Sequence, residues 1–253
     1  MHDFLADLRQ TLAPPRDSKD GILPPLLVAK TAVTGLVDAF SYLVLGHVFV
    51  ANMTGNVVFL AFAIAGVSGF NAADSLIAIA SFGVGAILAG RLAARFPERR
   101  EIRLAATAGG QALLIAISVV LALASGTPVP AGYRYALIVL LAAAMGMQNA
   151  TARKLAVPDL TTTVLTLTIT GIAADRDPGK VIRRLISVTA MLAGACVGAV
   201  LVLHARIVYP LVIALAILAA VAVIAARTSA AKAAAAPTSA APGSAVRRAS
   251  GPS

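Results

Sequence analysis

Long apolar stretches, separated by short polar or charged segments, dominate the pattern of this chain. A helix that crosses the hydrocarbon core of a bilayer needs about 20 mostly apolar residues. Six stretches satisfy this length and predict spanning helices over residues 24–46, 73–92, 104–124, 133–151, 185–204 and 207–226. The pattern therefore predicts an all-α fold, a polytopic membrane helix bundle with one membrane domain over 24–226.

Two further apolar segments, 48–68 and 160–174, are interrupted by polar residues. The first contains the string Asn52-Met-Thr-Gly-Asn56, and the second is rich in threonine. Basic residues lie beyond the spans on either side of 48–68 and directly on both flanks of 160–174. In each case the two basic regions belong to the same side of the membrane. An additional full crossing would break this parity. We expect both segments to be re-entrant or broken, one entering from each side.

The distribution of Lys and Arg predicts the topology. Basic residues concentrate in 91–103, 153–154, 176–184 and the C-terminal tail, and such loops are typically cytoplasmic. The N-terminal segment 1–23 also carries basic residues, so both termini are expected in the cytoplasm. Residues 227–253 are rich in Ala, Ser, Pro and Gly, which predicts a disordered tail.

A weak internal repeat emerges when the chain is shifted by 111 residues. The half-repeats cover about 24–125 and 133–226, and each holds three spans and one broken segment. Three crossings are an odd number, so the halves would face opposite ways, as in the inverted repeats of secondary transporters. The small or polar residues that coincide are Gly35 with Gly146, Asp38 with Asn149, Asn52 with Thr163, and Gly83 with Gly194.

Small residues spaced by four also occur within the predicted spans. Such spacing lets two membrane helices approach closely. The pairs are Gly85/Ala89, Ala86/Gly90 and Gly194/Gly198.

The composition excludes a soluble globular protein. Hydrophobic residues make up 59% of the 253 residues and charged residues 13%, against roughly half and about a quarter in soluble domains. The net charge of +10 could indicate nucleic-acid binding. The basic residues lie in short loops and tails, however, so the expected partner is the lipid bilayer and not nucleic acid. The single cysteine, Cys196, excludes an internal disulfide and a cysteine-based metal cluster.

Asp38 is the sharpest chemical signal, because it lies inside an otherwise apolar span. Carboxylates within membranes are costly and usually serve function, here the coupling of transport to protons or cations. The alternative is a structural role, in which a neutral Asp38 bonds the end of a broken helix. Lys30, two turns earlier, is expected to extend to the inner membrane surface.

The other candidate residues are amides and hydroxyls of the broken segments and of one span. Each could contact a solute, cap a helix end or join two helices. With Asp38, the candidates for solute binding are Asn52, Thr54, Asn56, Gln148, Asn149, Thr163 and Thr166.

Two functions fit this pattern. The first is a small secondary permease for a small polar solute or ion, in which Asp38 would couple transport to protons. The alternative is a membrane scaffold or assembly protein whose polar motifs only stabilise broken helices. We expect no enzyme, no metal site and no cofactor, because the chain shows no nucleophile–base arrangement and no phosphate-binding glycine loop.

Two strings resemble a known family. They are Val48-Phe-Val-Ala-Asn52-Met-Thr-Gly-Asn56, after Gly35-Leu-Val-Asp38-Ala, and Gly146-Met-Gln-Asn149-Ala with the threonines from Thr162 to Thr166. Over about 25–226 the chain resembles the YoaK-like family of uncharacterised bacterial membrane proteins. The resemblance implies a bacterial inner-membrane protein of about six spans and names no substrate.

Overall fold

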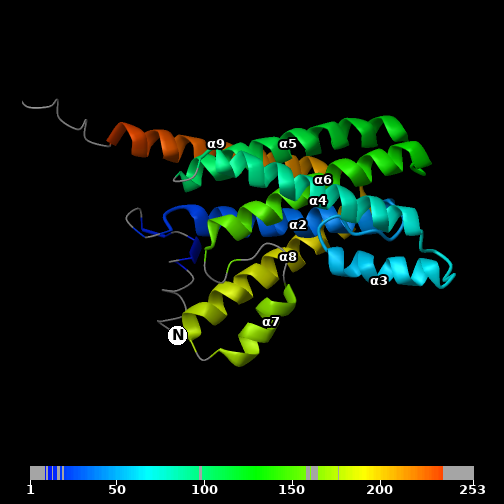
Figure 1. Ribbon diagram of the computed structural model, residues 1–253, viewed down its shortest axis with the longest axis horizontal. Helices are drawn as coiled ribbons and strands as arrows, with labels where there is room; N and C mark the ends of the chain where they lie inside the picture. Colours follow the sequence, from blue (N-terminus) through cyan, green and yellow to red (C-terminus); the bar gives the residue numbers. More distant parts are fainter. Residues whose placement is uncertain are drawn as a thin grey trace, which may run out of the picture.

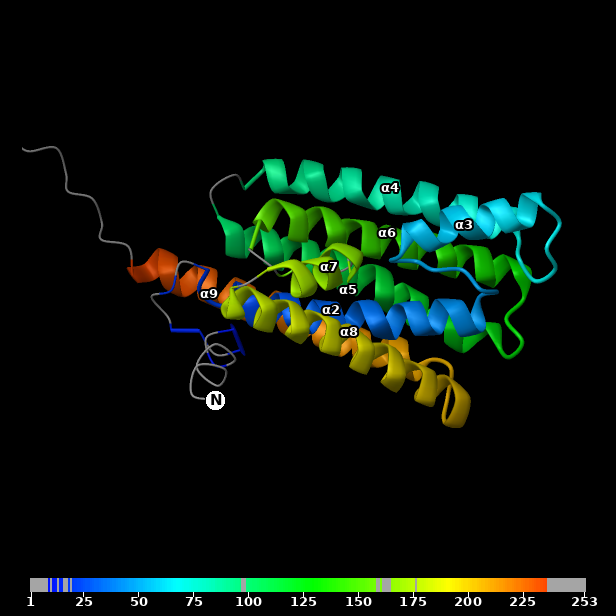
Figure 2. The same ribbon diagram turned by 90° about the horizontal axis from the view of Figure 1, so that it is seen from below.

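The computed structural model describes residues 9, 11–12, 14–15, 18, 20–96, 99–157, 160, 165–175 and 177–235. Over these residues the chain forms helices and no strand. Six long apolar helices lie side by side along one direction (Figures 1 and 2). They are α2 (Leu23–Val44), α4 (Ala72–Ala94), α5 (Arg100–Ser125), α6 (Ala131–Leu155), α8 (Pro178–His204) and α9 (Tyr209–Ala235). The predicted polytopic helical bundle is confirmed.

Local chemistry accounts for where several helices begin. Proline lacks the N–H that a first helical turn cannot use, and α2 and α8 both carry proline at their first positions. The Asn71 side chain accepts a hydrogen bond from the backbone N–H of Ala73 at 2.8 Å and so caps α4. Asp177 caps α8 by accepting from the N–H of Gly179 at 3.0 Å. Each cap satisfies a backbone donor that the helix leaves unpaired.

Two helices extend much further than the predicted spans. α8 begins at Pro178 instead of residue 185, and α9 continues to Ala235. Helix 178–204 thus includes several basic residues in its first turns, because hydropathy marks the apolar part of a helix and not its ends. The assignment of 227–235 to a disordered tail was wrong, since these Ala-rich residues continue the helix. The remainder of that tail, 236–253, lies outside the described residues.

Two short helices complete the bundle and fall within the two segments predicted to be broken. They are α3 (Met53–Ile64), which packs against α4, and α7 (Leu165–Ala174), which packs against α8. They lie toward opposite ends of the bundle (Figures 1 and 2). A helix rises 1.5 Å per residue, so neither is long enough to cross a bilayer.

Glycines at two helix crossings bring backbones into close contact. At the α2–α8 crossing, a Cβ on Gly35 would overlap the carbonyl oxygen of Met191, and one on Gly194 would overlap that of Ala32. Such substitution-intolerant contacts are typical of membrane helix pairs. The predicted small-residue packing is therefore correct for Gly194.

The α4–α6 crossing has the same construction. A Cβ on Gly85 would overlap the carbonyl oxygen of Ala143, and one on Gly146 would overlap that of Phe82. In contrast, a Cβ on Gly90 would meet nothing within 4 Å. The packing prediction therefore holds for Gly85 and is wrong for Gly90, where a side chain would have room.

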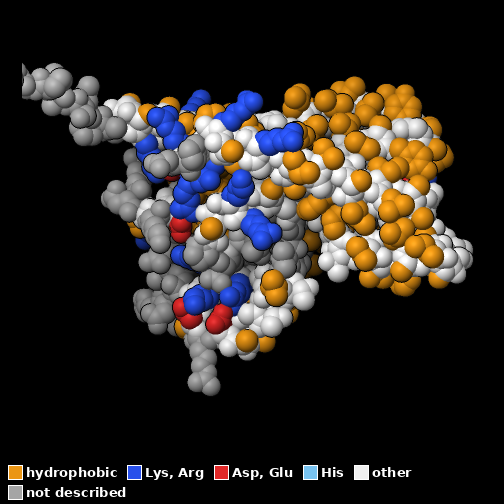
Figure 3. All heavy atoms as spheres, viewed as in Figure 1, with side chains coloured by type: hydrophobic (Ala, Val, Ile, Leu, Met, Phe, Trp, Pro, Cys, Tyr) orange, Lys and Arg blue, Asp and Glu red, His pale blue; other side chains and the backbone are white. Residues whose placement is uncertain are grey.

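Charge divides the bundle into two different ends. Lys and Arg gather at one end, where α9 terminates, and apolar side chains cover the rest of the visible face (Figure 3). We call this the basic end and the other the opposite end. The described residues that define the basic end are Arg91, Arg95, Arg99, Arg100, Arg103, Arg153, Lys154, Arg183, Arg184 and Lys232.

Candidate functional site

After α2 the chain reverses and runs back along the helix that it has just left. The reversal uses two residues with positive φ, Gly46 (93°) and His47 (59°). Residues 48–52 are not helical, and α3 begins at Met53. We call residues 45–64 the first hairpin. Non-helical backbone needs hydrogen-bond partners from the protein, because lipid supplies none.

Asp38 supplies part of what this backbone needs. Its Oδ1 accepts hydrogen bonds from the backbone N–H groups of Val50 at 3.1 Å and Ala51 at 2.9 Å. The side chain is buried, and Oδ2 has no hydrogen-bond partner among the described residues. The geometry matches the structural role considered for Asp38, bonding backbone at a broken helix. It leaves one carboxyl oxygen unused.

Asn56 forms hydrogen bonds with Phe49, the residue that precedes Val50 and Ala51. Its Oδ1 accepts from the N–H of Phe49 at 2.9 Å, and its Nδ2 donates to the Phe49 carbonyl oxygen at 2.5 Å. The side chain is fully buried, although its neighbours on α3 are largely exposed. Asp38 and Asn56 thus hold three consecutive residues, 49–51, in place. Both side chains bind backbone in this structure.

Gln148 joins two central helices. Its Nε2 donates to the Lys30 carbonyl oxygen at 2.9 Å and to Thr34 Oγ1 at 2.7 Å, linking α6 to α2. The glutamine is fully buried, so its geometry is that of the helix–helix contact considered from the sequence.

Lys30 does not reach the membrane surface, contrary to expectation. It is fully buried, and its Nζ has no hydrogen-bond partner within the described part of the chain. The reason is the position of α2 at the centre of the bundle, packed against α8, α9 and α6. Hydropathy alone could not show that this helix is enclosed on several sides.

The remaining described candidates line one cavity of about 520 Å³. It lies among α3, α4, α6, α7 and α8, and we call it the central cavity. Its polar lining comes from Asn52, Thr54, Asn149 and Thr166, which the chain brings together from three separate segments. Asn149 is half-buried, and its Nδ2 donates to the Met145 carbonyl oxygen at 3.0 Å. Thr163, the eighth candidate, lies outside the described residues.

Apolar side chains complete the cavity and were not singled out from the sequence. They are those of Ala51, Met53, Val58, Phe59, Phe82 and Met191. Two of these residues are adjacent to glycines that were singled out from the sequence. Gly146 faces the carbonyl group of Phe82, and Gly35 faces that of Met191. Residues facing a small-residue crossing lie near the bundle centre, so the glycines point indirectly to the cavity.

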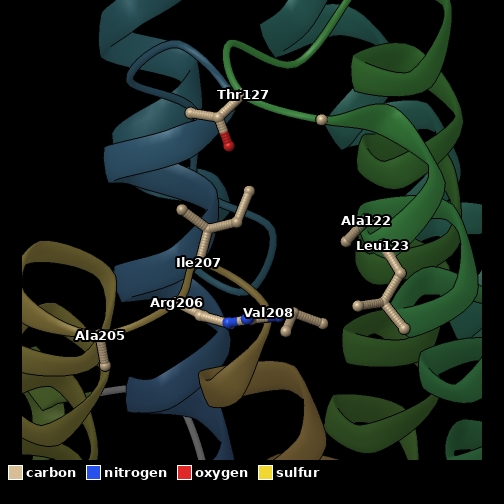
Figure 4. A pocket seen from close by; sticks show the side chains of 8 residues that line it. Ala122, Leu123, Thr127, Ala205, Arg206, Ile207 and Val208 are labelled. Atoms are coloured by element: carbon tan, nitrogen blue, oxygen red, sulfur yellow. The ribbon is translucent and has the colours of Figure 1, made fainter.

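A second cavity of about 360 Å³ lies between the end of α5 and the turn that joins α8 to α9. Figure 4 shows Ala122 and Leu123 on one side, and Ile207 and Val208 on the other. None of the predicted site residues lines it. Its polar side chains are those of Thr127 and Arg206, so it offers fewer groups for recognising a polar solute than the central cavity.

Metal binding finds no support in the described residues. These residues contain no group of three or more His, Cys, Asp or Glu side chains placed to hold an ion.

Comparison with known proteins identifies relatives of unknown function. The family described as "Protein of unknown function (DUF1275)" matches residues 26–224. The chain is 33% identical over 156 residues to the UPF0700 transmembrane protein YoaK of Bacillus subtilis (strain 168). That match covers 59% of this chain and 65% of the relative's length. No solved structure matches the chain. The resemblance to YoaK-like proteins is therefore confirmed.

Proposed function

This chain belongs to the membrane-protein family DUF1275, and from that premise we propose that it is a small secondary permease for a small, polar, uncharged solute. The observation that carries the proposal is the central cavity, in which Asn52, Thr54, Asn149 and Thr166 meet beside broken helices. Amides and hydroxyls together both donate and accept hydrogen bonds, so they can replace the water around such a solute. The proposal assigns the protein no catalytic activity and no cofactor.

The identity of the lining favours an uncharged solute. The cavity is lined by polar and apolar side chains, and none of the described residues that line it is ionisable. Asp38 does not line it. The carboxylate instead holds Val50 and Ala51, and Ala51 forms part of the cavity wall. We therefore assign Asp38 the role of a positioning residue, with Oδ2 as the atom available to a proton in a coupled cycle.

The two glycine crossings support an inverted repeat as the architecture behind transport. Gly35 and Ala32 of α2 lie 111 residues before Gly146 and Ala143 of α6, and the members of each pair make equivalent contacts. In their partner helices the shift is 109, relating Phe82 to Met191 and Gly85 to Gly194.

This change of register replaces one match expected from the sequence. Gly85, and not Gly83, makes the contact that corresponds to that of Gly194, and a Cβ on Gly83 would meet nothing within 4 Å. The reason is that the segment between α6 and α8 is shorter than the corresponding segment between α2 and α4. Helix pairing supports the same relation, since α3 packs on α4 as α7 packs on α8. Such halves can rock against each other around a central site.

The basic end supports an orientation. Cytoplasmic loops of membrane proteins carry an excess of Lys and Arg, and α2 begins and α9 terminates at the basic end (Figures 1 and 3). We therefore place this end, and both chain termini, in the cytoplasm of a bacterium, with the bundle in the inner membrane.

A proteoliposome assay tests the permease. Purified wild-type protein is exposed to a mixture of polyols, sugars and amides, with solute uptake followed by mass spectrometry and internal pH by a trapped dye. Each cavity hydrogen bond lost should slow uptake about tenfold, because an unpaired polar group in a binding site costs about 1–3 kcal/mol. We expect this loss for Asn52→Ala and Asn149→Ala.

Thr127→Ala, in the second cavity, is the matched control and should retain wild-type uptake. Asp38→Asn should retain solute binding and abolish the internal pH change if Asp38 carries the proton. Uptake into wild-type vesicles no faster than into empty liposomes would contradict the permease.

The alternative function is a membrane scaffold. One observation favours it. Asp38 accepts a hydrogen bond from a backbone N–H group, and Asn56 and Gln148 donate to backbone carbonyl oxygens, as expected of residues with a structural role. In that case wild type would move no solute, and Asn52→Ala and Asn149→Ala would affect only the stability of the protein.

A further inference from the structure

The two ends of the bundle are held together very differently. At the basic end, Arg100 pairs with Asp20 at 3.0 Å, Lys232 with Glu101 at 2.5 Å, and Arg184 with Asp175. Lys154 Nζ also donates to the Gly90 carbonyl oxygen at 3.2 Å, which ties α6 to α4. At the opposite end, the described residues supply one ion pair, between Asp74 and Arg134.

The Asp74–Arg134 pair joins the first turn of α4 to the first turn of α6. Arg134 Nη2 lies 3.5 Å from Asp74 Oδ1, and neither carboxylate oxygen of Asp74 has a hydrogen-bond partner among the described residues. Asp74 is only 2% exposed. Buried carboxylates are normally both paired and hydrogen-bonded. This one is enclosed without being fully satisfied, so its attachment to Arg134 is weak for a buried pair.

The pair also closes around the turn of the first hairpin. A methyl group placed on Gly46 would lie 3.5 Å from both Arg134 Nη1 and Asp74 Oδ2. Gly46 therefore sits directly against both charged groups. Five residues further along the hairpin, Ala51 begins the wall of the central cavity. The ion pair thus contacts the same segment, the first hairpin, that forms part of the cavity wall.

The Asp74 carboxylate remains stabilised when the two charges separate. It is the third residue of α4, and the N-terminus of a helix stabilises a negative charge. The Arg134 side chain is 26% exposed, so its charge has access to solvent. The pair can therefore open and close more readily than the interlinked contacts of the basic end.

From these contacts we propose that Asp74 and Arg134 form a latch that closes the opposite end of the bundle over the central cavity. Release of the latch frees Gly46 and lets the first hairpin move away from α4 and α6, while the basic end stays joined. The inference rests on the proposed permease, since a latch matters only if the cavity must open.

Labelling of a cysteine in the cavity tests the latch. In a Cys196→Ser background, Ala51→Cys is the reporter, because Ala51 lines the cavity and is only 4% exposed. A membrane-impermeant maleimide is added to intact cells or to inverted vesicles. We expect Asp74→Asn and Arg134→Gln each to raise labelling from the opposite end about tenfold, by shifting the population toward the open form. Labelling from the basic end should not change.

Two variants make the result specific. The exchange Asp74→Arg with Arg134→Asp restores the ion pair and should restore slow labelling. Lys232→Gln, which removes an ion pair at the basic end, should leave labelling from the opposite end unchanged. Arg134→Lys keeps the charge and serves where Arg134→Gln does not reach the membrane; its labelling should stay near wild type.

Unchanged labelling in both single variants would overturn the latch, as would an equal rise from both sides, which indicates general loosening. The readout does not need a transported solute. A wild-type protein that moves no solute would refute the permease and leave the labelling result standing, whereas normal uptake with unresponsive labelling would refute the latch alone.

Discussion

Asp38 and Asn149 occupy matching places in two helices and use their polar groups differently. Each follows its crossing glycine, Gly35 or Gly146, by three residues. Asp38 reaches across to backbone N–H groups of the first hairpin. Asn149 donates to the Met145 carbonyl oxygen within its own helix and lines the central cavity. From this difference we expect the two residues to play different parts, with Asp38 anchoring the first hairpin and Asn149 facing the proposed solute.

The largest expected effect comes from disturbing the frame itself. Gly35→Ala and Gly146→Ala each place a Cβ against a backbone carbonyl group, so the helices must separate. We expect each to lower the free energy of unfolding by about 3 kcal/mol, the upper range for overpacked sites, measured by thermal unfolding in detergent.

Gly83→Ala is the matched control for that experiment. A Cβ there meets nothing within 4 Å, and alanine favours a helix over glycine by about 1 kcal/mol. The control should therefore be neutral or stabilising. A large loss for Gly35→Ala with none for Gly146→Ala would break the equivalence of the two crossings.

A smaller effect should separate the two polar residues. Asp38→Ala leaves the buried N–H groups of Val50 and Ala51 without their shared acceptor, which should cost about 2 kcal/mol. Asn149→Ala removes, among its contacts, the hydrogen bond to the Met145 carbonyl oxygen, and we expect it to cost less, about 1 kcal/mol. Hydrogen exchange at the amides of Val50 and Ala51 should accelerate for Asp38→Ala only.

Asp38→Asn provides the control, because its amide oxygen can still accept both hydrogen bonds. It should unfold near the wild-type temperature. If Asn149→Ala destabilised the protein as much as Asp38→Ala, the division between an anchoring and a solute-facing residue would be wrong.

The smallest expected effect concerns Gln148. Its Nε2 bonds to Lys30 and Thr34, whereas the residue 111 positions earlier, Val37, is a buried apolar side chain. Gln148→Leu makes the second half resemble the first. It should lower the free energy of unfolding by about 1 kcal/mol, since hydrogen bonds between membrane helices contribute little.

Thermal unfolding in detergent measures this change, with Val139→Ala as a comparison at an exposed position of the same helix. A loss as large as that of Asp38→Ala would show that the α2–α6 contact, and not the first hairpin, is the more important polar link.

The membrane helices could be predicted from the sequence because the requirement is local. An apolar run of sufficient length must be a helix in lipid, whatever surrounds it. The ends of α8 and α9 could not, because helical hydrogen bonding continues past the apolar part wherever the next residues tolerate it. Among the candidate residues, Asn52 and Asn56 belong to one short string, yet one lines the cavity and the other is buried against Phe49.

The sequence alone determined that this protein is a helical membrane bundle, that its positive charge gathers on certain loops and that small residues mark close crossings. These properties depend on summed hydropathy and charge, which neighbours along the chain define. Only the tertiary structure decided that Lys30 is enclosed, that Asp38 binds the first hairpin and that Asp74 meets Arg134. Those outcomes depend on how each helix is rotated against partners distant in sequence, and on backbone that must find its hydrogen bonds inside the protein.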